Sequence, residues 1–209
     1  MKRLLSFLTV LLLLMPTAVD ASSTKVNNIG ITCQIDQNGT ATFVEKWDMD
    51  VSEGTEGYKI FNGMNDQPLT LIGVTDDRGV TYKNIGTWDS DVSRESKINK
   101  CGLIKDGGHY ELCFGLGDYG TRSYTMVYQI EHFVNQYKDQ QGINYAFISD
   151  MSLDVADVTI HVTGMTPYSK ENAKIWAFGY SGSVNFDNGG VTLKTDSLGS
   201  NKMQFINGS

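Results

Sequence analysis

The chain has 209 residues, of which 40% are hydrophobic and 20% are charged, and its formal net charge at pH 7 is −7. Phosphate contacts need clustered Lys and Arg, so this acidic balance argues against nucleic acid as a partner and against electrostatic adhesion to anionic lipid. A chain of this length buries about 70% of its unfolded surface, which suits one domain with a sizeable core.

The first twenty-one residues have the layout of a secretory signal peptide. Lys2 and Arg3 form a basic head, residues 4–15 form an apolar run, and residues 19–21 place modest or small side chains where a signal peptidase cuts. The apolar run is shorter than the roughly 20 residues of a membrane span. We therefore expect residues 1–21 to be removed and the mature chain, residues 22–209, to lie outside the cytoplasm. We expect no membrane span in this mature chain.

The start of the mature chain predicts a β-hairpin. Every second position is apolar in the first segment, at Ile29, Ile31, Cys33 and Ile35. The dipeptide Asn38-Gly39, which tolerates positive φ, then supplies a turn. The returning segment places one face at Ala41, Phe43, Trp47, Met49 and Val51. This alternation is typical of half-buried strands.

The same pattern continues to the end of the chain. Turn sequences at residues 76–79, 105–108 and 187–190 lie between short runs of strand-forming residues, and period-two alternation returns at 124–130, 158–162 and 176–180. No segment carries a sustained helical stripe. The sequence therefore predicts an all-β fold, an antiparallel β-sandwich that forms a single domain over residues 22–209.

Several segments, taken in order, resemble a known family. Their sequences are ITCQIDQNGTATFVEKW at 31–47, GYKIF at 57–61, YGTRSYTMVYQI at 119–130 and INYAF at 143–147. Together they are similar to the N-terminal extracytoplasmic domain of the predicted bacterial membrane proteins in domain-of-unknown-function family 2207. The resemblance implies a bacterial envelope protein with a β-rich domain and implies no established activity.

Two departures from the family pattern qualify this resemblance. The family tends to carry Trp where this chain has Ala146. It also continues into transmembrane helices and a Gly/Ser-rich tail, which are missing here. The chain is therefore expected to be either a secreted relative or the soluble part of a longer protein.

Two of the three cysteines are candidates for a disulfide. Cys101 and Cys113 lie six residues on either side of Gly107, so a hairpin would place them opposite each other, and export permits oxidation. The alternative is a pair of reduced thiols that face opposite sides or sit in a slipped register. Cys33 shares a face with isoleucines and is expected to be buried and free.

Metal and cofactor chemistry has no support in the sequence. His109, His132 and His161 stand in none of the spacings that zinc sites use. We therefore expect no cofactor and no metal ion.

Paired acids are the remaining candidates for catalysis. They occur at Asp48 and Asp50, at Asp76 and Asp77, and at Asp89 and Asp91. Such pairs can serve glycoside hydrolysis or calcium binding, but no calcium-loop sequence is present and solvated strand faces explain them equally. The nucleophile-elbow sequence is also absent. No residue is assigned a catalytic role.

One acid stands where a charge is costly. Glu45 falls in the middle of the apolar face of the second strand, so it needs a partner or a bulge that turns it outward. Lys59, at a basic position of the resembled family, is the first candidate partner and Arg122 is the second. Such a pair can fix how two segments dock, or Glu45 can face a ligand with a raised pKa.

The tryptophans differ in their surroundings. Trp47 and Trp176 lie in alternating patterns that predict burial. Trp88 lies in a polar loop, where it is either a candidate surface contact or part of a small core beneath the loop.

These observations favour a non-enzymatic binding or interaction module of the cell envelope, with a protein or an envelope glycan as its partner. The alternatives are a carbohydrate-active enzyme that uses paired carboxylates and a structural ectodomain of a longer membrane protein.

Overall fold

The computed structural model describes residues 24–151, 153, 155–179, 181–195 and 203–208, so the expected signal peptide lies outside the described residues. Within them the chain forms strands β1 to β15 and one short helix, α1 (Arg94–Lys97). The expected all-β sandwich is confirmed.

The largest sheet, here called sheet A, has seven strands in the order β13-β14-β11-β1-β2-β8-β4. Their bounds are β13 (Gly182–Asp187), β14 (Gly190–Thr195), β11 (Val155–Thr163), β1 (Lys25–Ile35), β2 (Ala41–Val51), β8 (Gly120–Ile130) and β4 (Leu69–Asp76). The expected hairpin of β1 and β2 forms around Asn38-Gly39, and Gly39 has a φ of 77°.

Two smaller sheets complete the fold. Sheet B has the order β3-β7-β6-β5, with β3 (Glu56–Phe61), β7 (His109–Gly115), β6 (Lys100–Asp106) and β5 (Lys83–Thr87). Sheet C has the order β12-β15-β10-β9, with β12 (Ile175–Phe178), β15 (Met203–Gly208), β10 (Gln141–Ile148) and β9 (Asn135–Gln136).

The sheets are mixed, whereas the sequence predicted antiparallel strands throughout. β1 pairs in parallel with β11, and β5 pairs in parallel with β6. The first parallel pair forms because β11 adds to the open edge of the β1–β2 hairpin after the chain has contributed β3 to β10 to all three sheets. Period-two alternation cannot distinguish the two pairing senses, since both alternate their side chains.

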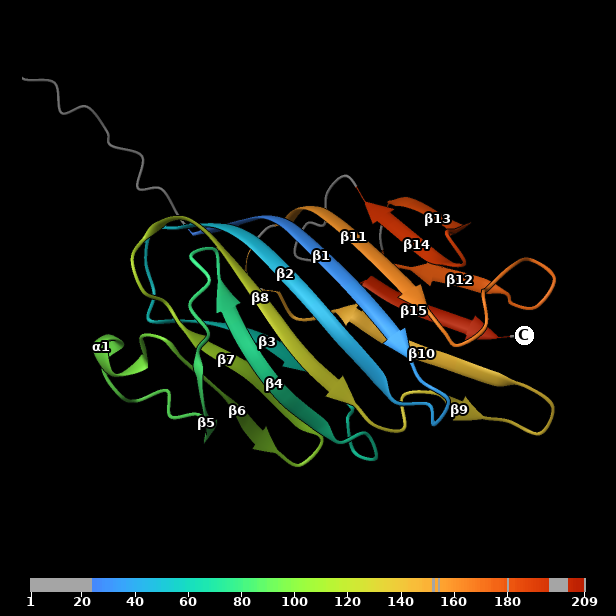
Figure 1. The fold of residues 1–209 in the computed structure, drawn as a ribbon, viewed down its shortest axis with the longest axis horizontal. Coiled ribbons are helices and arrows are strands. Elements are labelled where there is room, and N and C mark those ends of the chain that lie inside the picture. The colour runs from blue at the N-terminus through green and yellow to red at the C-terminus, as the bar shows by residue number, and fades with distance from the viewer. Residues whose placement is uncertain (1–23, 152, 154, 180, 196–202, 209) are drawn as a thin grey trace, which may run out of the picture.

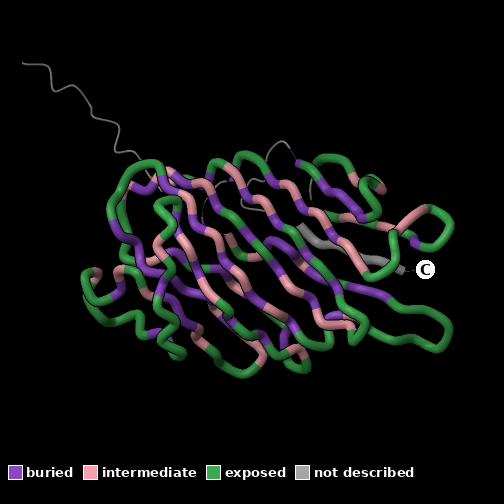
Figure 2. Tube along the Cα trace, viewed as in Figure 1, coloured by how far each residue is buried: buried purple, intermediate pink, exposed green. Residues whose placement is uncertain are grey.

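One face of β2 packs against both smaller sheets. The ring of Phe43 lies 6.2 Å from that of Phe147 on β10, and the ring of Trp47 lies 6.3 Å from that of Phe114 on β7. Both side chains project from the same face of β2, so sheets B and C lie on the same side of sheet A (Figure 1). Buried residues alternate with more exposed ones along sheet A (Figure 2), as expected for a sheet with one face in solvent.

The expected disulfide is not formed, and all three cysteines are free and buried. The hairpin of β6 and β7 does form, but it pairs Asp106 with His109, so Cys101 lies opposite Phe114 and not opposite Cys113. A shift of one residue sends side chains to opposite faces of a sheet. The turn is therefore centred between Gly107 and Gly108, and the symmetry about Gly107 misled the prediction.

Burial also makes these thiols unreactive. It raises the pKa of Cys33 far above its usual value and the pKa of Cys101 to about 11. It likewise raises the pKa of Cys113 to about 12. Since the thiolate is the nucleophile, the three side chains behave as small apolar core residues.

A matched pair of glycines tests the packing of β3 on the core. A Cβ on Gly57 would overlap the ring of Phe114, whereas Gly30 on β1 has nothing within 4 Å. We expect Gly57→Ala to lower the free energy of unfolding by about 1–3 kcal/mol, because the ring must move. Gly30→Ala should leave it unchanged or raise it by about 0.5 kcal/mol. Urea unfolding measures both, and equal effects would contradict this packing.

Candidate functional site

A buried carboxylate lies where the three sheets meet. Glu45 on β2 is 0% exposed and pairs across the sheet with Ile31 of β1 and Met126 of β8. Its Oε1 atom accepts a hydrogen bond of 2.7 Å from the indole Nε1 of Trp47, and its Oε2 atom accepts one of 2.7 Å from the hydroxyl of Tyr128. The carboxylate therefore remains in the interior without a bulge.

Lys59 supplies the positive charge. It comes from β3 of sheet B, it is 4% exposed, and its Nζ atom lies 3.1 Å from both carboxylate oxygens of Glu45. The same Nζ atom donates a hydrogen bond of 2.7 Å to the backbone oxygen of Phe147 on β10. One ammonium group thus joins sheet A to sheet B and to sheet C.

The polar groups around this pair are held in their neutral forms. Burial, followed by the charge of Glu45, raises the pKa of Tyr128 and that of Tyr145 well above the usual value. Neither phenol ionises at neutral pH. Within the described part of the chain, the hydroxyl of Tyr145 has no hydrogen-bond partner. The cluster therefore has the properties of a structural clamp, because every charge has a partner and no carboxylate oxygen faces solvent.

Breaking the clamp from either side should cost stability. We expect Lys59→Met and Glu45→Gln each to lower the free energy of unfolding by about 3–5 kcal/mol. The first change leaves the carboxylate of Glu45 buried without its countercharge, and the second does the same to the ammonium group of Lys59. The matched control is Lys46→Met on the same strand as Glu45, since Lys46 is 52% exposed in its ion pair with Asp48. That change should cost less than about 1 kcal/mol. Equal losses in denaturant unfolding would contradict the clamp.

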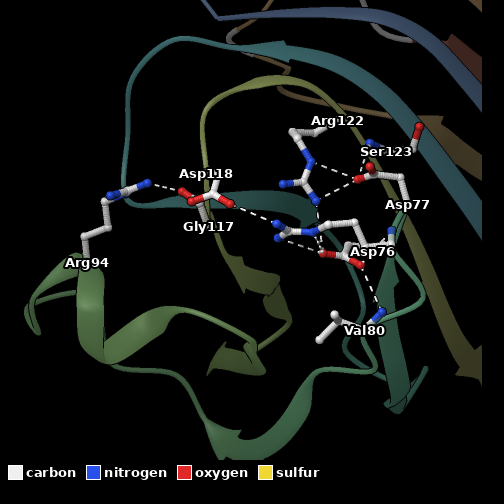
Figure 3. A network of polar contacts seen from close by, with 9 residues as sticks. Asp76, Asp77, Val80, Arg94, Gly117, Asp118, Arg122 and Ser123 are labelled. Carbon is white, nitrogen blue, oxygen red and sulfur yellow. Dashed lines mark hydrogen bonds and ion pairs between the residues drawn. The ribbon is translucent and has the colours of Figure 1, made fainter.

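A second charged cluster occupies one end of sheet A (Figure 3). Arg122, the second candidate partner of Glu45, lies here instead, on β8. Its Nη2 atom is 3.0 Å from Asp76 Oδ2 and 2.7 Å from Asp77 Oδ1.

Arg78 extends the cluster from Asp76, at 3.3 Å, to Asp118, at 2.8 Å. Arg94 of α1 donates to the backbone oxygen of Gly117 beside it.

Asp76 shapes the turn that follows β4. Its Oδ1 atom accepts hydrogen bonds from the backbone N–H groups of Arg78, at 3.0 Å, and Val80, at 2.9 Å. Burial by itself would raise the pKa of Asp76, but these backbone bonds and the Arg78 side chain outweigh it and lower the pKa. Burial also acts to raise the pKa of Asp77, but other contacts, chiefly the hydrogen bond from Arg122, outweigh it, so the pKa is lowered.

This cluster predicts a loss of stability in acid. A carboxyl whose pKa is lowered by folding stabilises the folded state above its unfolded pKa of about 3.9, and that stabilisation is lost as the pH falls through the folded value. We expect the free energy of unfolding to drop between about pH 4 and pH 2, and to drop less in Asp76→Asn. The control is Asp66→Asn at an exposed position, which should keep the parent pH dependence in urea unfolding at each pH.

The other acid pairs stand apart from the buried clamp. On the outer face of sheet A, Asp48 contacts Asn28, Ser123 and Lys46, while Asp50 accepts bonds from Asn27 and Thr121. Burial acts to raise the pKa of Asp48, but hydrogen bonds from Lys46, Ser123 and Asn28 outweigh it, so the pKa is lowered. Hydrogen bonds from Asn27 and Thr121 lower the pKa of Asp50. Both acids thus connect β2 to its neighbouring strands.

The third pair lies on the surface. Asp89 and Asp91 are exposed, and the side chain of Asp89 accepts a hydrogen bond of 2.9 Å from the backbone N–H of Asp91. This contact is a local turn within the loop before α1.

Trp88 is only 4% exposed, so of its two interpretations the small core beneath the loop agrees with the structure and the surface contact does not. Its backbone N–H donates a hydrogen bond to the backbone oxygen of Leu103 on β6. Trp176 was expected in the core but is 45% exposed, as is Phe178 at 51%, because β12 is the edge strand of sheet C and turns these two residues outward. Local polarity and alternation do not reveal which face of an edge strand is covered.

No pattern in the sequence indicates the pocket that lies between sheets B and C. This pocket of about 200 Å³ lies where β3 meets residues 149–151 and 153 above β2, and its lining includes Trp47, Met49 and Leu116. A neighbouring pocket of about 300 Å³ shares Ser149 and Asp150 with it and is lined by both polar residues, such as Asn62, and apolar ones, such as Met64. These pockets arise from segments far apart in the chain, so no local pattern could have predicted them.

In the part of the chain that the structure describes, no three His, Cys, Asp or Glu side chains gather closely enough to hold a metal ion. No helix among the described residues has the length and apolar character needed to cross a membrane.

The fold and the two charged clusters define an all-β sandwich in which one buried ion pair, Glu45 with Lys59, joins different sheets. Residues 25–204 match the family model described as "Predicted membrane protein (DUF2207) N-terminal domain". The chain therefore belongs to this family. The match agrees with the resemblance carried by the four sequence segments and extends it to residue 204, at the start of β15. No curated protein matches the chain.

Solved structures with a similar fold are distant in sequence. One is a protein from Parabacteroides distasonis that is provisionally called a protease, with 11% identity, a TM-score of 0.50 and coverage of 90% of this chain and 40% of that one. Another is leukotriene A4 hydrolase from Saccharomyces cerevisiae, with 8% identity, a TM-score of 0.52 and coverage of 89% and 29%. The chain thus spans less than half the length of either protein, and the likeness is one of fold alone.

Proposed function

We propose that the protein is a non-enzymatic binding or interaction module of the bacterial cell envelope, exported by the signal peptide at residues 1–21. Its partner is a protein or an envelope glycan outside the cytoplasm. The family, which consists of predicted membrane proteins, supports a location at the envelope.

The electrostatics of the acid pairs carry this proposal. Glycoside hydrolysis needs one carboxyl with a raised pKa that can act as an acid, beside a second that stays ionised. Folding instead lowers the pKa of both members of the pair Asp48 and Asp50 and of the pair Asp76 and Asp77. These four carboxyls are ionised at neutral pH and bonded to neighbouring strands or turns, which favours a structural role.

The buried clamp supports the same proposal. Glu45 could serve a ligand only if the ligand reached it, and its oxygens are already bonded to Trp47, Tyr128 and Lys59. We therefore assign Glu45 and Lys59 to architecture rather than to ligand binding. Rigid sheets joined in this way suit a scaffold that presents loops and edges to a partner.

Two alternatives remain distinct from this proposal. A structural ectodomain, in which the chain is the N-terminal part of a longer membrane protein, is supported by the description of the family. A carbohydrate-active enzyme would need an acid pair other than the two with lowered pKa values. The hydrolase and protease names of the fold neighbours bring no reaction to this chain, since their likeness is confined to the fold.

Sedimentation with isolated envelope fractions tests the proposal. We expect the mature chain to co-sediment saturably with either peptidoglycan sacculi or envelope membrane vesicles, without releasing soluble sugar or peptide. Because the clamp is architectural, Glu45→Gln should retain the same binding constant at temperatures where it stays folded.

The outcomes separate the alternatives. Release of reducing sugar that is lost in Asp89→Asn or Asp91→Asn would favour the enzyme. Loss of binding in Glu45→Gln with full stability would make Glu45 a ligand-facing residue. Absence of saturable binding to both fractions would overturn the binding module and favour the structural ectodomain.

A further inference from the structure

The pocket between sheets B and C combines an apolar interior with an acidic rim. Trp47 and Met49 of β2 lie beneath it together with Leu116, and all three are almost completely buried. Ile60 of β3 and Leu153 stand at its walls, and both are partly buried. These side chains offer apolar and polarizable surface to an aliphatic chain.

The position of the pocket keeps it open to a partner. β3 is the edge strand of sheet B, so one side of β3 carries no neighbouring strand of that sheet. Beyond this edge, the hydroxyl of Ser149 donates a hydrogen bond of 3.2 Å to the backbone oxygen of Ile60, and Lys59 reaches Phe147. These contacts hold the end of β10 against β3 beside the pocket.

Negative charge surrounds the entrance. Glu53, Glu56 and Asp150 line the pocket, and no lysine or arginine does. Glu56 is paired with Lys97, and Asp150 accepts a hydrogen bond from Asn62. Glu53 is exposed and takes part in none of the ion pairs that the described residues form. The rim therefore favours a cationic group, with Glu53 as its nearest uncompensated charge.

The size of the pocket limits what can enter. Its volume of about 200 Å³ is smaller than the roughly 300–1,000 Å³ of typical small-molecule sites. It suits one long side chain rather than a whole cofactor or an oligosaccharide. Lysine and arginine combine an aliphatic stem, which can lie on Trp47 and Met49, with a charged head that can remain at a polar rim.

We propose that this pocket binds a lysine or arginine side chain presented by a partner protein. The proposal rests on the binding module proposed above and names the chemistry that the module recognises. The stem lies along the apolar walls and the cation stands among the carboxylates of the rim, nearest to Glu53. Exposed charge pairs contribute modestly, so most of the affinity comes from burial of the stem and the rim supplies selectivity.

Two probes that differ only in charge test this proposal. N-acetyl-lysine N-methylamide and N-acetyl-norleucine N-methylamide share a four-carbon stem, and only the first carries an ammonium group. Each is titrated into the mature chain while NMR follows the indole N–H of Trp47, assigned with single Trp→Phe variants. We expect the lysine probe to shift this resonance saturably and to bind about two- to fivefold more tightly than the norleucine probe.

Variants at the rim provide the control. Glu53→Gln should weaken the lysine probe about two- to fivefold and leave the norleucine probe unchanged, and Glu53→Lys should weaken the lysine probe further. Glu131→Gln removes the same charge at an exposed position that does not line the pocket, and it should change neither probe.

Three results would overturn the proposal. They are equal binding of the two probes, an equal effect of Glu53→Gln and Glu131→Gln, and no shift at Trp47 with either probe. Envelope binding that persists despite any of these results would leave the binding module intact and move its site elsewhere.

Discussion

The ion pair between Glu45 and Lys59 is the interaction on which the three-sheet arrangement depends. Sheets B and C have separate hydrogen-bond ladders, and both contribute a group to one ammonium ion that lies over β2. Hydrophobic burial has no preferred direction of its own. A buried charge with fixed partners has one low-energy position, so we infer that this pair helps to set the registry of the layers.

The sequence was most informative where a pattern of neighbouring residues is typical of a single backbone structure, a strand or a turn. Alternation located β1, β2, β8 and β11, and Asn38-Gly39 located the first turn. The same rule made Glu45 conspicuous, because a charge in an apolar alternation demands a partner. The structure brings Lys59 to it, whereas Arg122 has carboxylates of its own at the end of β4.

Other features could not be predicted because they depend on which segments meet. The parallel entry of β11 and the exposure of Trp176 both follow from neighbours distant in the chain, and so does the choice between the two interpretations of Trp88. The free state of Cys101 and Cys113 depends on whether a turn is centred on a residue or between two residues. Pockets at the meeting of sheets share this origin, since their walls come from strands with no sequence relation.

The central position of β1 has a consequence for the order of folding. β1 lies between β2 and β11, and its contact with β11 joins residues about 130 positions apart, such as Val26 and Val155. The first strand must therefore wait for most of the chain before its second edge is covered. Contacts of such long range slow the search for the native state to milliseconds or seconds in domains of this class. Sheet A therefore lacks the strand that covers this edge of β1 until β11 (Val155–Thr163) has been synthesised.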